Sequence, residues 1–207
     1  QSFFALSSAM CAKSMQVSGI DQDVSSSGVH ANSMKAFVTD MMQEAAQILV
    51  QLSGAKGYRI SHIGGRAIMD SRPFQIFEGS NEMLYTQISE GILKDMKKKK
   101  TENLAQYLDI NETTKNAATV YSKDLDLNVT APISQRKMID LGKIVARVII
   151  VNDLSELNDS GFSQELTDNC IQMVRQEIRN LISSMQHHEN ISALEDTSNK
   201  SDWMLFS

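Results

Sequence analysis

Apolar residues recur every three or four positions between residues 34 and 52, over about five turns of an α-helix. These positions are Met34, Phe37, Val38, Met41, Met42, Ala45, Ile48, Leu49 and Leu52. A half-buried strand would alternate with a period of two, so the spacing predicts an amphipathic helix in the core of a helical bundle. Asn32 or Ser33 is expected to cap the start of this helix, and two glycines in the segment 53–57 are expected to end it.

Helical spacing also occurs in segments far from this one. The predicted helices are residues 2–17, about 80–95, 134–157 and 162–186. Ser80 or Asn81 is expected to cap the second of them. The third is so densely apolar that more than one face must be covered, and it is expected to pack antiparallel to the fourth.

Weaker patterns predict a short helix around residues 64–70 and one or two short helices after residue 101. Only 2 prolines and 10 glycines interrupt the 207 residues. The chain is therefore predicted to be all-α, an antiparallel helical bundle over residues 1–100 with a helical extension over residues 101–207.

The charge of the chain limits its partners. A net charge of −5 argues against a nucleic-acid-binding protein, because such domains normally carry a basic excess. One basic run, KDMKKKK at residues 94–100, has two interpretations: a solvated helix C-terminus favoured by the helix dipole, or a peripheral contact with a membrane surface. The longest apolar run, residues 144–154, is too short for a membrane span of about 20 residues.

The cysteines and histidines give no support for a metal site. Cys11 and Cys170 lack a CxxC spacing and are too few for a disulfide framework, so we expect two packed thiols in a reducing compartment. His62 is expected to face solvent from a loop. The adjacent His187 and His188 should point to different faces of a helix, which makes a poor metal site.

Two short elements make the sequence more specific. The first is QLSGAKGY at residues 51–58, and the second is IFEGSNE at residues 76–82, each next to a predicted helix. Together they resemble the C-terminal helical domain of the flavin-dependent acyl-CoA dehydrogenases, in which a Gln-x-x-Gly-Gly-x-Gly-Tyr/Phe element precedes Ile-Tyr/Phe-Glu-Gly-Thr. The resemblance covers residues 2–96, and the segment 101–207 is similar, less specifically, to the extra helical domain of the very-long-chain branch.

The resemblance implies a role for Glu78. In this family the corresponding glutamate is the general base that removes the α-proton of a fatty acyl-CoA thioester, while the β-hydrogen leaves as hydride to the flavin. Such a base must lie close to the proton and away from water, and an apolar pocket formed by neighbours such as Phe77 would provide this. Gly79 is expected beside the thioester, where its missing Cβ lets the backbone approach. Without the element at residues 51–58, Glu78 would be interpreted only as a residue that stabilises a helix N-terminus.

The resemblance also implies contacts with FAD. Positions that touch the FAD of the neighbouring subunit are matched by Gln51, Leu52, Ser53, Gly54 and Ala55. Positions near the same cofactor are matched by Ser80, Asn81 and Glu82. Three departures are notable: Ala55 replaces the second glycine, Met69 precedes Asp70 where Arg-Asp is usual, and the pair Asn81-Glu82 adds negative charge.

The family context implies a fatty acyl-CoA substrate, FAD, an electron-transfer flavoprotein or similar acceptor, and a homodimer. The sequence lacks a strand-rich region like the family's middle β-domain, and it opens in an apolar helical pattern without an initiator methionine. We therefore expect the C-terminal part of a longer enzyme, inactive alone. The expected compartment is the cytoplasm, with the mitochondrial matrix as the alternative. The competing hypothesis is a non-catalytic helical assembly or membrane-docking module derived from this family.

Overall fold

A computed structural model describes residues 1–17, 28–130 and 133–187, and this part of the chain is built from α-helices. In chain order they are α1 (Ser2–Val17), α2 (Gly28–Ser53), α3 (Ile63–Ser71), α4 (Asn81–Lys99), α5 (Leu104–Asp109), α6 (Lys115–Tyr121), α7 (Gln135–Asp159) and α8 (Gln164–His187). Short 3₁₀ turns follow α2 and α3, namely η2 (Gly54–Lys56) and η3 (Arg72–Gln75). The described ranges contain no β-strand, which confirms the all-α prediction.

Helix starts show where local rules succeed and fail. Ser80 caps α4 as expected, since its side chain accepts a hydrogen bond from the backbone N–H of Met83. Helix α2 begins at Gly28, so the prediction of a cap at Asn32 or Ser33 is wrong. Ser33 lies inside the helix, where its hydroxyl donates to the carbonyl of Val29 at 2.7 Å. That bond satisfies the hydroxyl within the helix itself.

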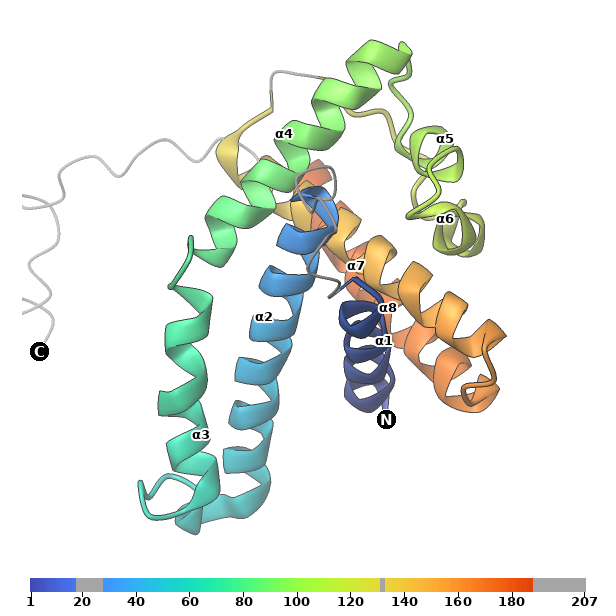
Figure 1. Ribbon diagram of the computed structural model, residues 1–207. Coiled ribbons are helices and arrows are strands. Elements are labelled where there is room, and N and C mark those ends of the chain that lie inside the picture. Colours follow the sequence, from blue (N-terminus) through green and yellow to red (C-terminus); the bar gives the residue numbers. More distant parts are fainter. Residues whose placement is uncertain (18–27, 131–132, 188–207) are drawn as a thin grey trace, which may run out of the picture.

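Helix α7 lies at the centre of the fold. It packs against α1, α2, α4, α6 and α8, and residues on several of its faces are buried, as its dense apolar pattern predicted. Helix α8 runs back along α7 after a turn at Gly161 (Figure 1). The helices before and after residue 100 share one hydrophobic core. The division into two domains at this residue stays a prediction from sequence.

A buried polar cluster joins α1 and α2 to α7. Asp153 of α7 is buried, and its carboxylate lies 2.8 Å from His30 Nε2 and 3.7 Å from Lys13 Nζ. Lys13 Nζ also donates to Glu156 at 2.8 Å. Burial alone would lower the pKa of Lys13, but the hydrogen bonds and charges of Glu156 and Asp153 outweigh it, so the pKa is raised. The buried carboxylate therefore has charged and hydrogen-bonding partners, without which its burial would be costly.

The two cysteines differ in environment. Cys170 on α8 is fully buried, as expected, and burial raises the pKa of its thiol to about 12. Cys11 is exposed on α1, so the prediction that it is packed is wrong. In the ranges that the structure describes, no helix is both long and apolar enough to cross a membrane.

Helices α2 and α3 form a hairpin that projects from the rest of the fold (Figure 1). The first half of α2 is buried against other helices, but the second half exposes part of the apolar stripe that the sequence placed in a core. The exposed members are Met42, Ala45, Ile48, Leu49 and Leu52, with Leu52 81% exposed. Among the described residues, α3 and the two 3₁₀ turns pack on one side of this half of α2, and its other side is left uncovered (Figure 1).

Candidate functional site

Glu78 and Gly79 form a tight turn between η3 and α4. Both have positive φ angles, 56° for Glu78 and 95° for Gly79. For a residue with a Cβ this conformation costs on the order of 1–2 kcal/mol. Among the described non-glycine residues Lys100 shares it, but Lys100 ends α4, where a left-handed residue is common. The strain at Glu78 is therefore maintained by the contacts around the turn.

The carboxylate of Glu78 is presented at the surface of this chain. Glu78 is exposed, and Phe77 beside it is 65% exposed. The expected apolar pocket around Glu78 is thus not formed by the described residues, and that prediction is wrong for this chain taken alone. The turn is instead flanked by exposed apolar side chains on both sides in sequence, which are Phe74, Ile76, Phe77 and Met83.

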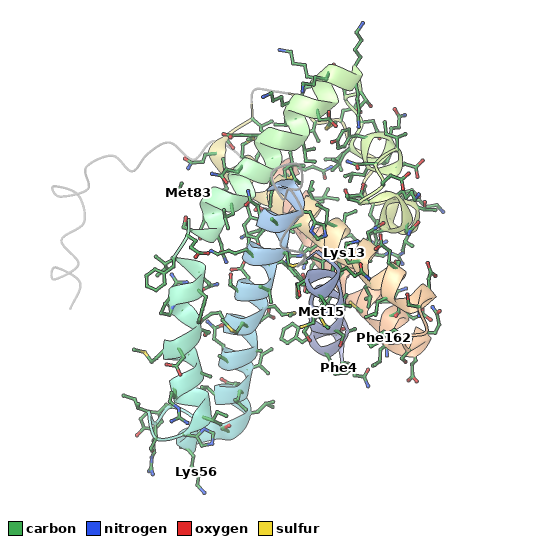
Figure 2. All side chains as sticks on the ribbon, viewed as in Figure 1. Phe4, Lys13, Met15, Lys56, Met83 and Phe162 are labelled. Atoms are coloured by element: carbon green, nitrogen blue, oxygen red, sulfur yellow. The ribbon has the colours of Figure 1, made fainter. Side chains whose placement is uncertain are left out.

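The element at residues 51–58 lies at the free end of the hairpin, where Figure 2 shows Lys56. Gln51, Leu52, Gly54 and Ala55 are exposed there, and Ser53 is half-buried with its hydroxyl donating to the carbonyl of Leu49. Gly54 has a φ of 58°, and no atom lies within 4 Å of the position that a Cβ would occupy. The backbone of this end is therefore open to the approach of a ligand.

Other residues of the same end have structural roles that their sequence did not show. A Cβ at Gly57 would lie 2.7 Å from the carbonyl oxygen of Val50, so glycine lets the chain pass close to α2. His62 was expected to face solvent, but it is half-buried and caps α3. Its Nδ1 accepts a hydrogen bond from the N–H of Gly64 at 3.1 Å. Histidine is not among the residues preferred at this position, so no capping rule would have found it.

The structure does not bring the two sets of expected cofactor residues together. Asn81 packs against α2 at the level of Ala36, and Gln51 lies 15 residues further along α2. At about 1.5 Å per residue the separation along the helix is roughly 22 Å. Figure 2 shows the same arrangement, with Met83 at the start of α4 and Lys56 at the far end of the hairpin.

The three expected cofactor residues at the start of α4, Ser80, Asn81 and Glu82, differ in their burial and hydrogen bonds. Asn81 is only 3% exposed, and both ends of its amide are hydrogen-bonded inside the protein. Its side chain is therefore not free to contact FAD as the resemblance implied. Ser80 is half-buried and caps α4, while Glu82 is exposed in the first turn. No group of three or more His, Cys, Asp or Glu side chains in the described ranges is arranged to hold a metal ion.

Comparison with known families identifies the helices that carry the turn. Residues 6–93 match the family model described as acyl-CoA dehydrogenase, C-terminal domain. This part of the chain is similar to acyl-CoA dehydrogenase C-terminal domains. The match runs from within α1 to within α4 and includes both sequence elements, while α5 to α8 lie outside it. Comparison with the curated proteins and with the solved structures gave no match.

Acyl-CoA dehydrogenases are in general FAD-dependent, and the free end of the hairpin fits a cofactor contact. The side chains of Gln51 and Leu52 and the backbone of Gly54 are accessible, and the exposed Lys56 adds a positive charge beside them. Ala55 is exposed as well, so its extra methyl fills no space inside the fold. Met69, which stands where the family has arginine, is exposed on α3.

The backbone of Gly79 supports a prediction about stability. Gly79→Ala should lower the free energy of unfolding by about 1 kcal/mol, because the strain of a positive φ, about 1–3 kcal/mol, exceeds the gain from a less flexible unfolded chain. The nearest atom to an added Cβ is Leu84 Cδ2 at 3.5 Å, so a steric clash is not the cause. Urea unfolding measures the effect. Glu78→Ala, which keeps a Cβ in the same turn, is the control and should change the free energy by less than about 0.5 kcal/mol; equal stability of the two variants would contradict the assignment.

Proposed function

We propose that this chain is the C-terminal part of a flavin-dependent acyl-CoA dehydrogenase that catalyses α,β-desaturation of fatty acyl-CoA thioesters. The observation that carries the proposal is Glu78. Glu78, which by resemblance of its motif corresponds to the family's general base, lies in the matched range and occupies a strained, surface-presented turn just before α4. A helix-stabilising glutamate would not need a left-handed backbone.

In the proposed reaction Glu78 accepts the α-proton of the thioester. The electron pair of that C–H bond forms the new double bond as the β-hydrogen leaves with its own pair. The chemistry that FAD supplies when bound is acceptance of this hydride. Gly79 follows the base, and its missing Cβ leaves room for the thioester to lie against the backbone.

Glu78 and its neighbours also indicate what else the reaction needs. A base for a weakly acidic C–H proton works best when water is excluded. In this chain Glu78 and Phe77 are exposed, so further protein surface, together with the substrate, would have to cover them. The exposed apolar side chains of Phe74, Ile76 and Met83 are suited to such a contact. We therefore expect the chain alone to be inactive.

The exposure of residues 51–55 at the free end of the hairpin fits a homodimer in the proposed enzyme. Residues 51–55 at the free end of the hairpin would contact the FAD of the neighbouring subunit. Ser80 and Glu82, roughly 22 Å away along α2, would lie near another part of the same long dinucleotide. An electron-transfer flavoprotein or similar acceptor would then reoxidise the enzyme.

The full-length protein tests this proposal. We expect it to purify with bound flavin, and to lose the visible flavin absorbance when a fatty acyl-CoA is added without an acceptor. A series of acyl-CoA substrates from short to very long would define the preferred chain length. A protein that stays colourless with added FAD would instead support the non-catalytic assembly module.

A second candidate function, peripheral membrane contact, is favoured by the lysine-rich end of α4. Lys97, Lys98 and Lys100 are exposed there, whereas Lys99 pairs with Asp95 at 3.0 Å. This end lies at the edge of the fold, away from the α2–α3 hairpin (Figure 1). A surface so placed can approach anionic lipids without covering the Glu78 turn.

Vesicle binding tests the membrane contact. Changing Lys97, Lys98 and Lys100 together to glutamine should weaken binding to vesicles that contain anionic lipid by at least about tenfold, since each lysine near such a surface contributes about 1 kcal/mol. Co-sedimentation at low ionic strength measures the binding. The matched control changes three exposed lysines elsewhere to glutamine; these are Lys56, Lys115 and Lys123. Equal losses for the two triple variants would show a non-specific effect of charge.

A further inference from the structure

One face of α2 holds the Glu78–Gly79 turn through hydrogen bonds. Lys35 Nζ donates to the carbonyl oxygen of Gly79 at 2.9 Å and to Asn81 Oδ1 at 3.0 Å. Lys35 is half-buried, and charge-assisted hydrogen bonds in partly buried surroundings are stronger than neutral ones in water. The side of the turn that leads into α4 is thus fixed to α2.

Asn81 extends this contact. Its Nδ2 donates to Asp40 Oδ1 at 2.6 Å, to Thr39 Oγ1 at 2.8 Å and to the carbonyl of Ala36 at 3.1 Å. Since Asn81 is the first residue of α4, these bonds fix the start of that helix on α2. The side-chain amide of Asn81 therefore helps to hold the turn in place.

Asp40 connects the two sides of the turn. Besides Asn81, its Oδ1 accepts from Gln75 Nε2 at 2.7 Å, three residues before Glu78. Its Oδ2 accepts from the hydroxyl of Tyr85 at 2.7 Å. Burial, reinforced by the charge of Asp40, raises the pKa of Tyr85, so this hydroxyl remains a donor at neutral pH. One carboxylate therefore holds the chain both before and after Glu78.

We propose that Lys35 and Asp40 are positioning residues that hold the Glu78–Gly79 turn in its left-handed conformation and so place the Glu78 carboxylate against the substrate. The inference rests on the proposed role of Glu78. The turn contains two consecutive residues with positive φ, which would relax without outside support. A base displaced by about 1 Å can lose a hundredfold in rate, so fixing this backbone matters for catalysis.

Hydrogen exchange on the 207-residue chain tests the structural part. The N–H groups of Ile76 and Phe77 donate to the carbonyl of Pro73 at 3.0 and 2.9 Å and report on the turn. Lys35→Met and the milder Asp40→Asn should each speed their exchange at least about tenfold relative to the rest of the chain. The outcome that overturns the inference is unchanged exchange at these amides, or a uniform increase throughout the molecule.

A matched control separates the turn from general loss of packing. Ser89 lies on the same helix as Asn81, is buried, and donates to the carbonyl of Met138 at 2.6 Å, so Ser89→Ala removes a buried contact of α4 that does not touch the turn. We expect exchange at Ile76 and Phe77 to stay within twofold in this variant. A tenfold increase in Ser89→Ala would also overturn the inference.

Kinetics of the full-length flavoprotein test the catalytic part. In Lys35→Met and Asp40→Asn, kcat should fall about 10- to 100-fold while the KM for acyl-CoA changes less than threefold. Lys35→Arg, which keeps a donor and a positive charge, should recover most of the lost kcat. Unchanged kcat, or a loss explained entirely by lower flavin content, refutes the positioning role alone. A wild-type protein that does not react with acyl-CoA refutes the proposed function itself, whatever the exchange experiment shows.

Discussion

Glu78→Gln is expected to slow acyl-CoA-dependent reduction of the flavin by about a thousandfold in the full-length protein, within the usual range for loss of a general base. Glutamine has nearly the shape of glutamate but cannot accept the α-proton. Because Glu78 is exposed in this domain, the substitution should leave the free energy of unfolding nearly unchanged. Stopped-flow measurement of flavin bleaching under single-turnover conditions gives the rate, and titration with acyl-CoA gives the affinity, which should change little.

The control for this experiment is Glu90→Gln. Glu90 is an exposed carboxylate on α4, 12 residues further along the chain, and the variant makes the same change in charge. Its bleaching rate should stay within about threefold of wild type. If Glu78→Gln kept more than a tenth of the wild-type rate, another group would have to be the base, and the function proposed for the turn would be wrong.

A helix could be predicted from the sequence where the apolar pattern of its own residues defines it. The dense apolar pattern of residues 134–157 predicted a helix covered on several faces, and α7 is packed by five other helices. The start of α2 was not predictable in this way. Helix α2 extends back to Gly28, and His30 in its first turn is held by Asp153, 123 residues away in sequence. A rule that looks for a capping residue cannot detect such a contact.

The Glu78–Gly79 turn likewise depends on contacts between residues that are far apart in sequence. The position of the turn followed from the sequence, because the motif around Glu78 lies directly before a helix cap. The hydrogen bonds that hold the turn did not follow, because Lys35 and Asp40 come from another helix, more than 40 residues from Asn81. The role of Asn81 was misassigned for this reason. Exposure of Phe77 was missed because its neighbours in space are set by tertiary packing.

The close approach of α4 and α7 was equally hidden in the sequence. Gly142 occurs within a long helical pattern, where glycine is ordinarily a mild weakness. In the structure a Cβ at this position would overlap the carbonyl oxygen of Tyr85 and lie 2.6 Å from its carbonyl carbon. These are backbone atoms of α4, so no side-chain rotation can make room. The missing side chain at Gly142 therefore sets the distance between the two helices.

Gly142→Ala should consequently lower the free energy of unfolding by about 3 kcal/mol or more, the upper part of the range for overpacking. The gain in helix propensity of about 1 kcal/mol does not offset this cost. Urea unfolding measures the difference.

The control is Gly91→Ala on α4, where an added Cβ meets Val29 Cγ2 at 3.1 Å, a side-chain atom that can yield. We expect that variant to lie within about 1 kcal/mol of wild type. Equal stability of Gly142→Ala and wild type would mean that α4 and α7 are further apart than described.

Gly142→Ala and Glu78→Gln also distinguish loss of the helix packing from loss of the catalytic base in the proposed enzyme. Helix α4 begins at Asn81, three residues after Glu78, so a shift of α4 away from α7 would move the turn as well. Gly142→Ala should then lose stability and bleaching together, and Gly91→Ala should lose neither. Glu78→Gln should lose bleaching alone, because it changes the proton acceptor and leaves the helices where they are. Loss of both properties in Glu78→Gln would instead assign Glu78 a structural role.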